Sequence, residues 1–186
     1  LKSGRSAAAR GAIVSHTAAL AGEGASSSAF LRQCGVAEVR TPAELSETLK
    51  LLHLFGPLPG ARVASLSCSG GEAGMIADLA ADHALSLPPP PPERADRLSR
   101  LLGPMVTVTN PLDYHTFIWG DRARMQAVFA AMMGAPWDLT LLVMDLPHTG
   151  RCDPSGWAPA IDALIGAQAG TGARVALLST MPENLP

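Results

Sequence analysis

From residue 58 onward, short apolar runs alternate with longer amphipathic runs. The pattern predicts strands at 62–68, 105–109, 138–145 and 174–179, and helices at 72–83, 121–133 and 157–168. Strands separated by helices of about ten residues predict a parallel sheet with right-handed crossovers. Ligands of such sheets bind beyond the carboxyl ends of the strands, so the loops at that edge are the first place to seek a site.

The segment Gly56-Pro-Leu-Pro-Gly60 predicts a domain boundary, because two glycines and two prolines in five residues cannot continue a helix. We expect residues 1–57 to end one α/β unit and residues 58–186 to form a second. In the first unit the pattern predicts a β-type run at 12–14, a helix at 25–34 with Ala29 and Phe30 inward, a strand at 36–39, and a helix from Thr41. Gly35 ends the first helix, and Thr41-Pro-Ala-Glu44 forms a capping box for the second.

Composition excludes several classes of protein. The 186 residues are 47% hydrophobic but 4% aromatic, which indicates a globular core of Ala, Leu, Val and Met. A net charge of −2 argues against a nucleic-acid surface. No apolar run approaches the ~20 residues of a membrane span.

Three cysteines without a C-x-x-C pair favour reduced thiols in the cytoplasm over a disulfide frame or a zinc site. Pro88 to Pro92 predicts an extended polyproline connector.

His16 is the first candidate for chemistry. It lies between the predicted β-type run and a string of small residues that ends at Gly22, so other groups can approach its imidazole from several directions. A reference pKa of ~6.5 leaves a histidine mostly neutral near pH 7, which suits a nucleophile or a proton carrier. The alternative is a capping or solvated loop histidine.

Ser69-Gly70-Gly71 lies where a predicted strand turns into a helix. Backbone N–H groups there can close on an anion, and a helix N-terminus adds roughly half a positive charge. The segment is not a P-loop, because Glu72 follows in place of Gly-Lys-Ser/Thr. A plain turn is the alternative to a phosphate nest.

Two further loops follow predicted strands. Asn110-Pro-Leu-Asp113 is a turn whose polar ends, Asn110 and Asp113, are candidate site residues. The loop 146–153 holds His148, Cys152 and Asp153, but their spacing does not match a metal site, and we predict no metal in this chain. A G-x-S-x-G elbow is also missing, which argues against a serine hydrolase.

Three segments carry a family resemblance: Lys2-Ser-Gly-Arg-Ser6, Ser15-His-Thr-Ala-Ala-Leu-Ala-Gly22 and Gly35-Val-Ala-Glu-Val-Arg-Thr-Pro-Ala-Glu-Leu45. They resemble the NDP-forming acyl-CoA synthetases, the ADP-forming acetate–CoA ligases related to succinyl-CoA synthetase. The resemblance implies flavodoxin-like three-layer α/β/α domains, one partial (1–57, with the histidine loop) and one nearly complete (58–186). It also implies that His16 carries a phosphoryl group, that Ser69, Gly70 and Gly71 face it, and that Asn110 and Asp113 form an N-P-x-D segment. Many members have Gly where this chain has Ala18.

The implied reaction interconverts acyl-CoA, phosphate and ADP with a carboxylic acid, CoA and ATP, through an acyl phosphate and a phosphohistidine. An acid-thiol ligase of this kind uses CoA, phosphate and ADP or ATP, with Mg²⁺ on the nucleotide in the whole enzyme. The resemblance implies a fragment without the CoA-binding and ATP-grasp domains, inactive alone, and a homo-oligomeric enzyme. The alternatives are a sensory module of a protein acetyltransferase and a binding-only flavodoxin-like domain.

Overall fold

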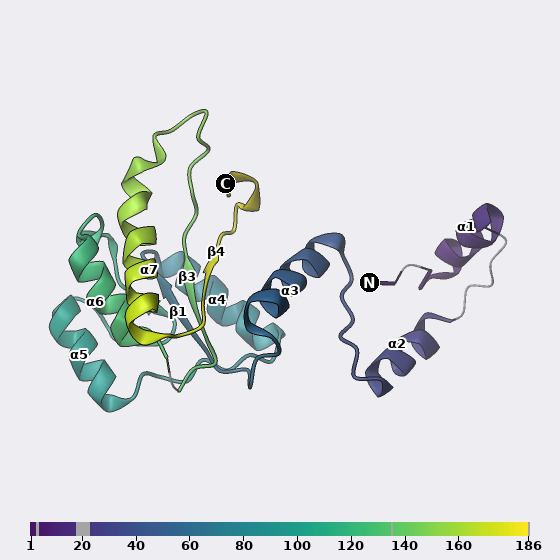
Figure 1. Cartoon of the computed structure of the whole chain (residues 1–186), viewed down its shortest axis with the longest axis horizontal. Helices are drawn as coiled ribbons and strands as arrows, with labels where there is room; N and C mark the ends of the chain where they lie inside the picture. The colour runs from purple at the N-terminus through teal and green to yellow at the C-terminus, as the bar shows by residue number, and fades with distance from the viewer. Residues whose placement is uncertain (3, 18–22, 135, 186) are drawn as a thin grey trace. The chain divides into compact units, whose positions relative to one another are not determined.

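The computed structural model describes residues 1–2, 4–17, 23–134 and 136–185, and omits the side chains of His16 and Thr17 (Figure 1). The chain forms two compact units, Leu1–Pro57 and Leu58–Pro186. None of the helices within these ranges combines the length and the apolar character that crossing a membrane requires.

The first unit contains three helices in its described part: α1 (Ala7–Thr17), α2 (Gly24–Gln33) and α3 (Pro42–Phe55). The β-type run predicted at 12–14 is wrong, because these residues lie inside α1. Three alanines, Ala7 to Ala9, open that helix, and alanine has the highest helix propensity. The strand predicted at 36–39 is also wrong. The described part of this unit holds no strand with which that segment could pair.

The end of α2 and the start of α3 lie where the sequence predicts them. Gly35 has a φ of +68°, and α2 ends just before it, as predicted. At the start of α3, the Glu44 amide donates to Thr41 Oγ1 at 3.1 Å, and a Glu44 carboxylate oxygen accepts from the Arg40 amide at 2.6 Å. The predicted Thr41 cap is therefore confirmed, whereas Glu44 reaches back to the Arg40 amide and not to the Thr41 amide. The inward positions of Ala29 and Phe30 are wrong, because both side chains are exposed, Phe30 over 64% of its surface.

The second unit is an α/β sheet with four parallel strands in the order β2-β1-β3-β4. Its strands are β1 (Val63–Ser67), β2 (Leu112–Asp113), β3 (Leu139–Val143) and β4 (Val175–Leu178). Its α-helices are α4 (Gly70–Asp82), α5 (Pro92–Leu102), α6 (Arg122–Met132) and α7 (Ala158–Thr171). Single-turn 3₁₀ helices are η1 (Thr116–Ile118), η2 (Pro154–Trp157) and η3 (Pro182–Asn184). The predicted parallel α/β fold is confirmed.

Helices cover both faces of this sheet (Figure 1). Helix α4 packs on one face against β1, and α6 and α7 cover the other, with α5 against α6. Every residue of β1 is buried, as expected of a central parallel strand. Leu66 of β1 pairs with Leu112 on one side and Leu142 on the other, and all three are fully buried. This core fixes the strand ends and the loops that follow them.

One strand prediction within this unit is wrong, and one helix was missed. The strand expected at 105–109 does not form, and the pairing with β1 is made by β2, Leu112–Asp113. Met105 is 81% exposed, so the apolar run was not a buried strand. Helix α5 was not predicted; it begins at Pro92, directly after the extended residue Pro91, and buries Leu98 and Leu102.

An ion pair joins the segments that enter β1 and β3. Asp138 Oδ2 accepts from the backbone N–H of Arg62 at 3.0 Å and from its Nε at 3.2 Å, and Oδ1 accepts from Nη2 at 3.1 Å. A Cβ at Gly60 would lie 2.6 Å from Asp138 Oδ2, so this close approach requires glycine. The pair fixes the amino ends of the two central strands beside each other.

Candidate functional site

The strand order places a crevice at the carboxyl ends of β1 and β3. After β1 the chain forms β2 on one side of β1, and it then forms β3 and β4 on the other side. The connections therefore diverge between β1 and β3. Open α/β sheets bind ligands at such a switch point. A cavity of about 480 Å³ lies there, lined by Cys68, Glu72, Thr116, Trp119, Met144, Asp145 and Trp157. We call it the switch-point cavity.

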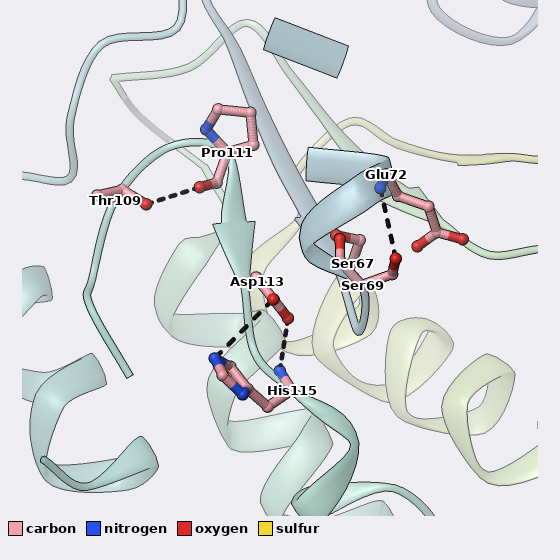
Figure 2. Close-up of polar contacts among 7 residues, drawn as sticks. All are labelled: Ser67, Ser69, Glu72, Thr109, Pro111, Asp113 and His115. Carbon is pink, nitrogen blue, oxygen red and sulfur yellow. Dashed lines mark hydrogen bonds and ion pairs between the residues drawn. The ribbon is translucent and has the colours of Figure 1, made fainter. Parts of the chain in front are cut away.

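Helix α4 begins at this edge, directly after β1. Ser69 is its N-cap: Ser69 Oγ accepts from the Glu72 amide at 3.4 Å, and the Ser69 carbonyl accepts from Ser67 Oγ at 3.0 Å (Figure 2). Gly70 and Gly71 are the first helical residues. The first N–H groups of a helix have no intrahelical acceptor, so this turn presents donors and a partial positive charge to its surroundings.

Asp113 lies against the same turn. Its Oδ2 is 3.4 Å from the position a Cβ would take at Gly70. Its Oδ1 accepts from the His115 amide at 2.9 Å, and Oδ2 lies 3.9 Å from His115 Nε2 (Figure 2). The structure thus brings together Asp113 and the Ser69–Gly71 segment, which are 42 residues apart by number (113 minus 71).

Asn110, the other candidate in this loop, has a different environment. Its side-chain oxygen accepts from the Ser65 amide at 3.0 Å, and its Nδ2 donates to the carbonyls of Val63 at 2.8 Å and Pro88 at 2.9 Å. All of these partners are backbone groups, two in β1 and one in the loop before α5. The Asn110 side chain therefore holds the loop to the sheet.

Sequence reasoning missed Glu72 as a site residue, although it directly follows the glycine pair. One of its carboxylate oxygens, Oε2, is buried without a hydrogen-bond partner among the described residues. Burial raises the pKa of Glu72, and the nearby Asp145 and Asp113 carboxylates raise it further. Glu72 therefore keeps a proton to higher pH than an ordinary glutamate does.

Asp145 and Cys68 complete the polar wall of the cavity. Burial acts to raise the pKa of Asp145, but hydrogen bonds from the Thr180 and Ser179 hydroxyls and nearby amides outweigh it and lower that pKa. Burial, followed by the Glu72 charge, raises the pKa of the Cys68 thiol. Asp145 is thus the anionic member of the wall, whereas burial favours the neutral forms of Glu72 and Cys68.

His16 is a residue of α1, but its side chain lies outside the part of the chain that the structure describes, as do residues 18–22 of its segment. Across the described ranges, no three His, Cys, Asp or Glu side chains are grouped so that they could hold a metal ion. In the loop 146–153, His148 Nδ1 accepts from the Gly150 amide and Asp153 bonds to Ser155, so both side chains stabilise local turns.

Comparisons with known proteins agree with the resemblance noted in the sequence. Residues 1–52 match a family model described as the succinyl-CoA ligase like flavodoxin domain. An ADP-forming acetate–CoA ligase of Methanocaldococcus jannaschii is 31% identical over 116 residues, 61% of this chain and 16% of that protein. The alpha subunit of ADP-forming acetate–CoA ligase II of Pyrococcus furiosus is 35% identical over 115 residues, 61% of this chain and 24% of that protein. The resemblance to ADP-forming acyl-CoA synthetases is confirmed.

Two further similarities extend this result. A trans-feruloyl-CoA synthase from an unknown prokaryotic organism is 33% identical over 113 residues, 61% of this chain and 16% of that protein. A dinucleotide forming acetyl-coenzyme A synthetase of Ca. Korarchaeum cryptofilum, solved in complex with phosphate and ADP, has a TM-score of 0.80 at 20% identity, and the match covers 96% of this chain and 38% of that one. This structural likeness shows the fold. The chain spans 16% to 24% of the length of the curated relatives it matches.

Proposed function

We propose that this chain is part of an NDP-forming acyl-CoA synthetase and carries its phosphohistidine, His16. The similarity to ADP-forming acetate–CoA ligases over 61% of the chain carries this proposal. The segment Ser15-His-Thr-Ala-Ala-Leu-Ala-Gly22 supplies the residue that the chemistry needs. The rest of the enzyme, with its CoA-binding and ATP-grasp domains, lies elsewhere on the same chain or on a partner subunit.

The proposed reaction has three balanced steps. Phosphate attacks the thioester carbonyl of an acyl-CoA, which releases CoA and forms an acyl phosphate. A neutral His16 imidazole nitrogen then attacks the phosphorus, which forms a P–N bond and breaks the bond to the carboxylate oxygen. ADP takes the phosphoryl group in the last step and leaves as ATP, with Mg²⁺ on the nucleotide.

The first turn of α4 is the proposed phosphate site. The N–H groups of Gly70 and Gly71 present donors there, and the helix N-terminus favours negative charge. Asp113 and Glu72 lie beside this turn, and a phosphate would be repelled by two ionised carboxylates. The raised pKa of Glu72 reduces that repulsion, because a protonated Glu72 is neutral and can donate a hydrogen bond.

Phosphoryl labelling tests the proposal. We would incubate the full-length protein with ATP labelled at the γ position and compare wild type, His16→Asn and His83→Asn. The control changes a histidine at the C-cap of α4, where we propose no chemistry. We expect label that is stable in alkali, lost in acid, present in the control and absent from His16→Asn. A folded, ADP-binding wild type without label would refute the synthetase and favour a sensory module or a binding-only domain.

A further inference from the structure

A cavity of about 550 Å³ lies at the amino edge of the second unit, where α6 and α7 lead back into β3 and β4. Helix α5 contributes Glu93, Arg94 and Arg97 to its wall, and Gly134 and Thr171 lie across from them. The two arginines are three residues apart, so they lie on one face of α5. We call this cavity the α5 cavity.

The fold holds the Arg94 guanidinium in place. Its Nη1 donates to the carbonyls of Ala131, at 3.2 Å, and Met133, at the carboxyl end of α6, where a cation is favoured. Its Cζ lies 5.5 Å from the centroid of the Trp137 ring. Trp137 is buried and donates from Nε1 to the Pro88 carbonyl at 3.2 Å. Arg94 is therefore ordered before a ligand arrives, so an anion that binds it costs little side-chain entropy.

Arg94 keeps donors for a ligand. Its bonds to α6 use Nη1, and its Nε and Nη2 have no hydrogen-bond acceptor among the described residues. Nη2 lies 3.8 Å from the position that a Cβ would take at Gly134, and the absent side chain leaves this approach open. Arg97 is exposed and makes no hydrogen bond or ion pair within the part of the chain that the structure describes. The cavity thus offers one fixed and one free guanidinium.

More arginines lie next to the α5 cavity. An adjoining cavity of about 460 Å³ shares Gly134 with it and is lined by Arg62 and Arg174, at the entries of β1 and β4. Arg62 bonds to Asp138, and its side chain is still 54% exposed. In the described lining of the two cavities, four arginines accompany two carboxylates, those of Glu93 and Asp138. This excess of positive charge favours a ligand with more than one negative charge.

We propose that the α5 cavity binds the diphosphate group of an organic ligand, either a nucleoside diphosphate or CoA. A guanidinium presents paired N–H donors that match phosphate oxygens, and it stays charged at every physiological pH. The cavity volume is within the range of small-molecule sites, ~300–1,000 Å³. This site lies at the amino ends of the strands, whereas the switch-point cavity and the first turn of α4 lie at the carboxyl ends. It is therefore independent of the proposed phosphohistidine chemistry.

Calorimetric titration of the 186-residue chain with inorganic pyrophosphate tests the site. Arg97→Gln removes the free guanidinium. Arg100→Gln is the matched control, because Arg100 is exposed on the same helix, one turn further along, and lies outside the described lining. Glu93→Gln removes the carboxylate that would repel the ligand. Thermal unfolding checks that each variant folds as wild type does.

We expect Arg97→Gln to weaken pyrophosphate binding at least about tenfold, and Arg100→Gln to change it less than about twofold. Glu93→Gln should strengthen binding about threefold or more, because it removes a repulsive charge. Equal losses in Arg97→Gln and Arg100→Gln overturn the site, because they indicate a general attraction to a charged helix. Equal affinity for sulfate and pyrophosphate overturns it too, as does no binding of pyrophosphate by wild type.

Titrations with ADP and with CoA distinguish the two sources of the diphosphate. Tighter binding of ADP, lost in Arg97→Gln, assigns the site to a nucleoside diphosphate, and tighter binding of CoA with the same loss assigns it to CoA. Pyrophosphate binding without binding of either organic molecule overturns the proposed ligand class. None of these results depends on label at His16, so the site and the proposed synthetase are refuted separately.

Discussion

Tyr114 places a hydroxyl group in the core, where it meets no described residue in good hydrogen-bond geometry and has the Cys68 thiol as a polar neighbour. The side chain is fully buried, and its ring packs edge to face on Phe129 at 5.3 Å. Burial, followed by the neighbouring Cys68, raises the pKa of Tyr114, so the hydroxyl stays neutral.

We predict that Tyr114→Phe leaves the free energy of unfolding unchanged or raises it by up to about 1 kcal/mol, because it removes an unsatisfied polar group and keeps the ring. Urea denaturation measures the change. Tyr114→Leu, which loses the ring contact, should be less stable than wild type. A loss of more than about 1 kcal/mol in Tyr114→Phe would mean that the hydroxyl has a partner.

In contrast to the Tyr114 hydroxyl, the Asn110 side chain forms hydrogen bonds with three backbone groups. We predict that Asn110→Ala lowers the free energy of unfolding by about 2 to 4 kcal/mol, because the buried Ser65 amide and two carbonyls lose their partner. Asn184→Ala removes one such bond and should cost about 1 kcal/mol or less. Similar losses in the two variants would contradict the anchoring role of Asn110.

At the scale of elements, the Arg62–Asp138 pair links the entries of β1 and β3. Hydrogen bonds from the Arg62 side chain and backbone lower the pKa of Asp138. A carboxylate with a lowered pKa adds stability above its unfolded pKa of ~3.9 and loses that contribution as the pH falls through the folded value.

We therefore predict that wild type loses stability on acidification below about pH 4 more steeply than Asp138→Asn does. Urea denaturation between about pH 2.5 and 6 measures both slopes. Asp162→Asn, which removes a carboxylate from the exposed surface of α7, is the control. If Asp138→Asn shows the same acid slope as wild type, the pair does not contribute in the way described.

The βα alternation predicted most of the second unit, because a fully buried strand and an amphipathic helix leave different periodicities. The errors have identifiable causes. Ala12 to Val14 looks like a strand by residue type, but the helix-forming alanines before it decide the conformation. The run 105–109 is apolar, yet a strand needs a neighbour for its backbone groups, and β1 pairs with Leu112 and Asp113 instead.

The missed helix α5 did have a signal. Leu98 and Leu102 are four residues apart, and Pro92 occupies a first-turn position that favours proline. Residues 88–92 were interpreted as one extended proline run, so the helix that begins at the last of these prolines was not predicted.

The candidate site was predictable only in part. Ser69, Gly70 and Asp113 could be named from turn chemistry, since each follows an expected or actual strand end. The burial of Glu72 and the place of Trp157 in the wall of the switch-point cavity depend on packing from distant segments, which no local pattern encodes. The hydrogen bonds of Asn110 were hidden for the same reason, because their partners are 22 to 47 residues away.

At the scale of the whole molecule, the two units differ in how much side-chain surface they bury. The second unit holds a large apolar core. In the described part of the first unit, the buried residues are Gly4, Gly24 and Ser28, and α3 buries none. Leu49 and Leu54 of α3 are 55% and 69% exposed.

We predict that limited proteolysis of the 186-residue chain cuts first within residues 1–57 and leaves a resistant fragment that begins near Leu58. Local opening exposes a cleavable backbone most readily where few apolar contacts hold it. Mass spectrometry of the products identifies the cut sites. Early cuts within β1 or α7 would contradict this order.

Strand β1 is buried along its whole length and has a neighbour on each edge. Its amide hydrogens can reach solvent only when the sheet itself comes apart, so their exchange with deuterium reports the global opening of this unit. The segment that leads from β1 into the first turn of α4 thus joins the slowest-exchanging part of the chain to the proposed phosphate site. A site built on that junction is therefore anchored, at its β1 end, to the part of the chain that opens last.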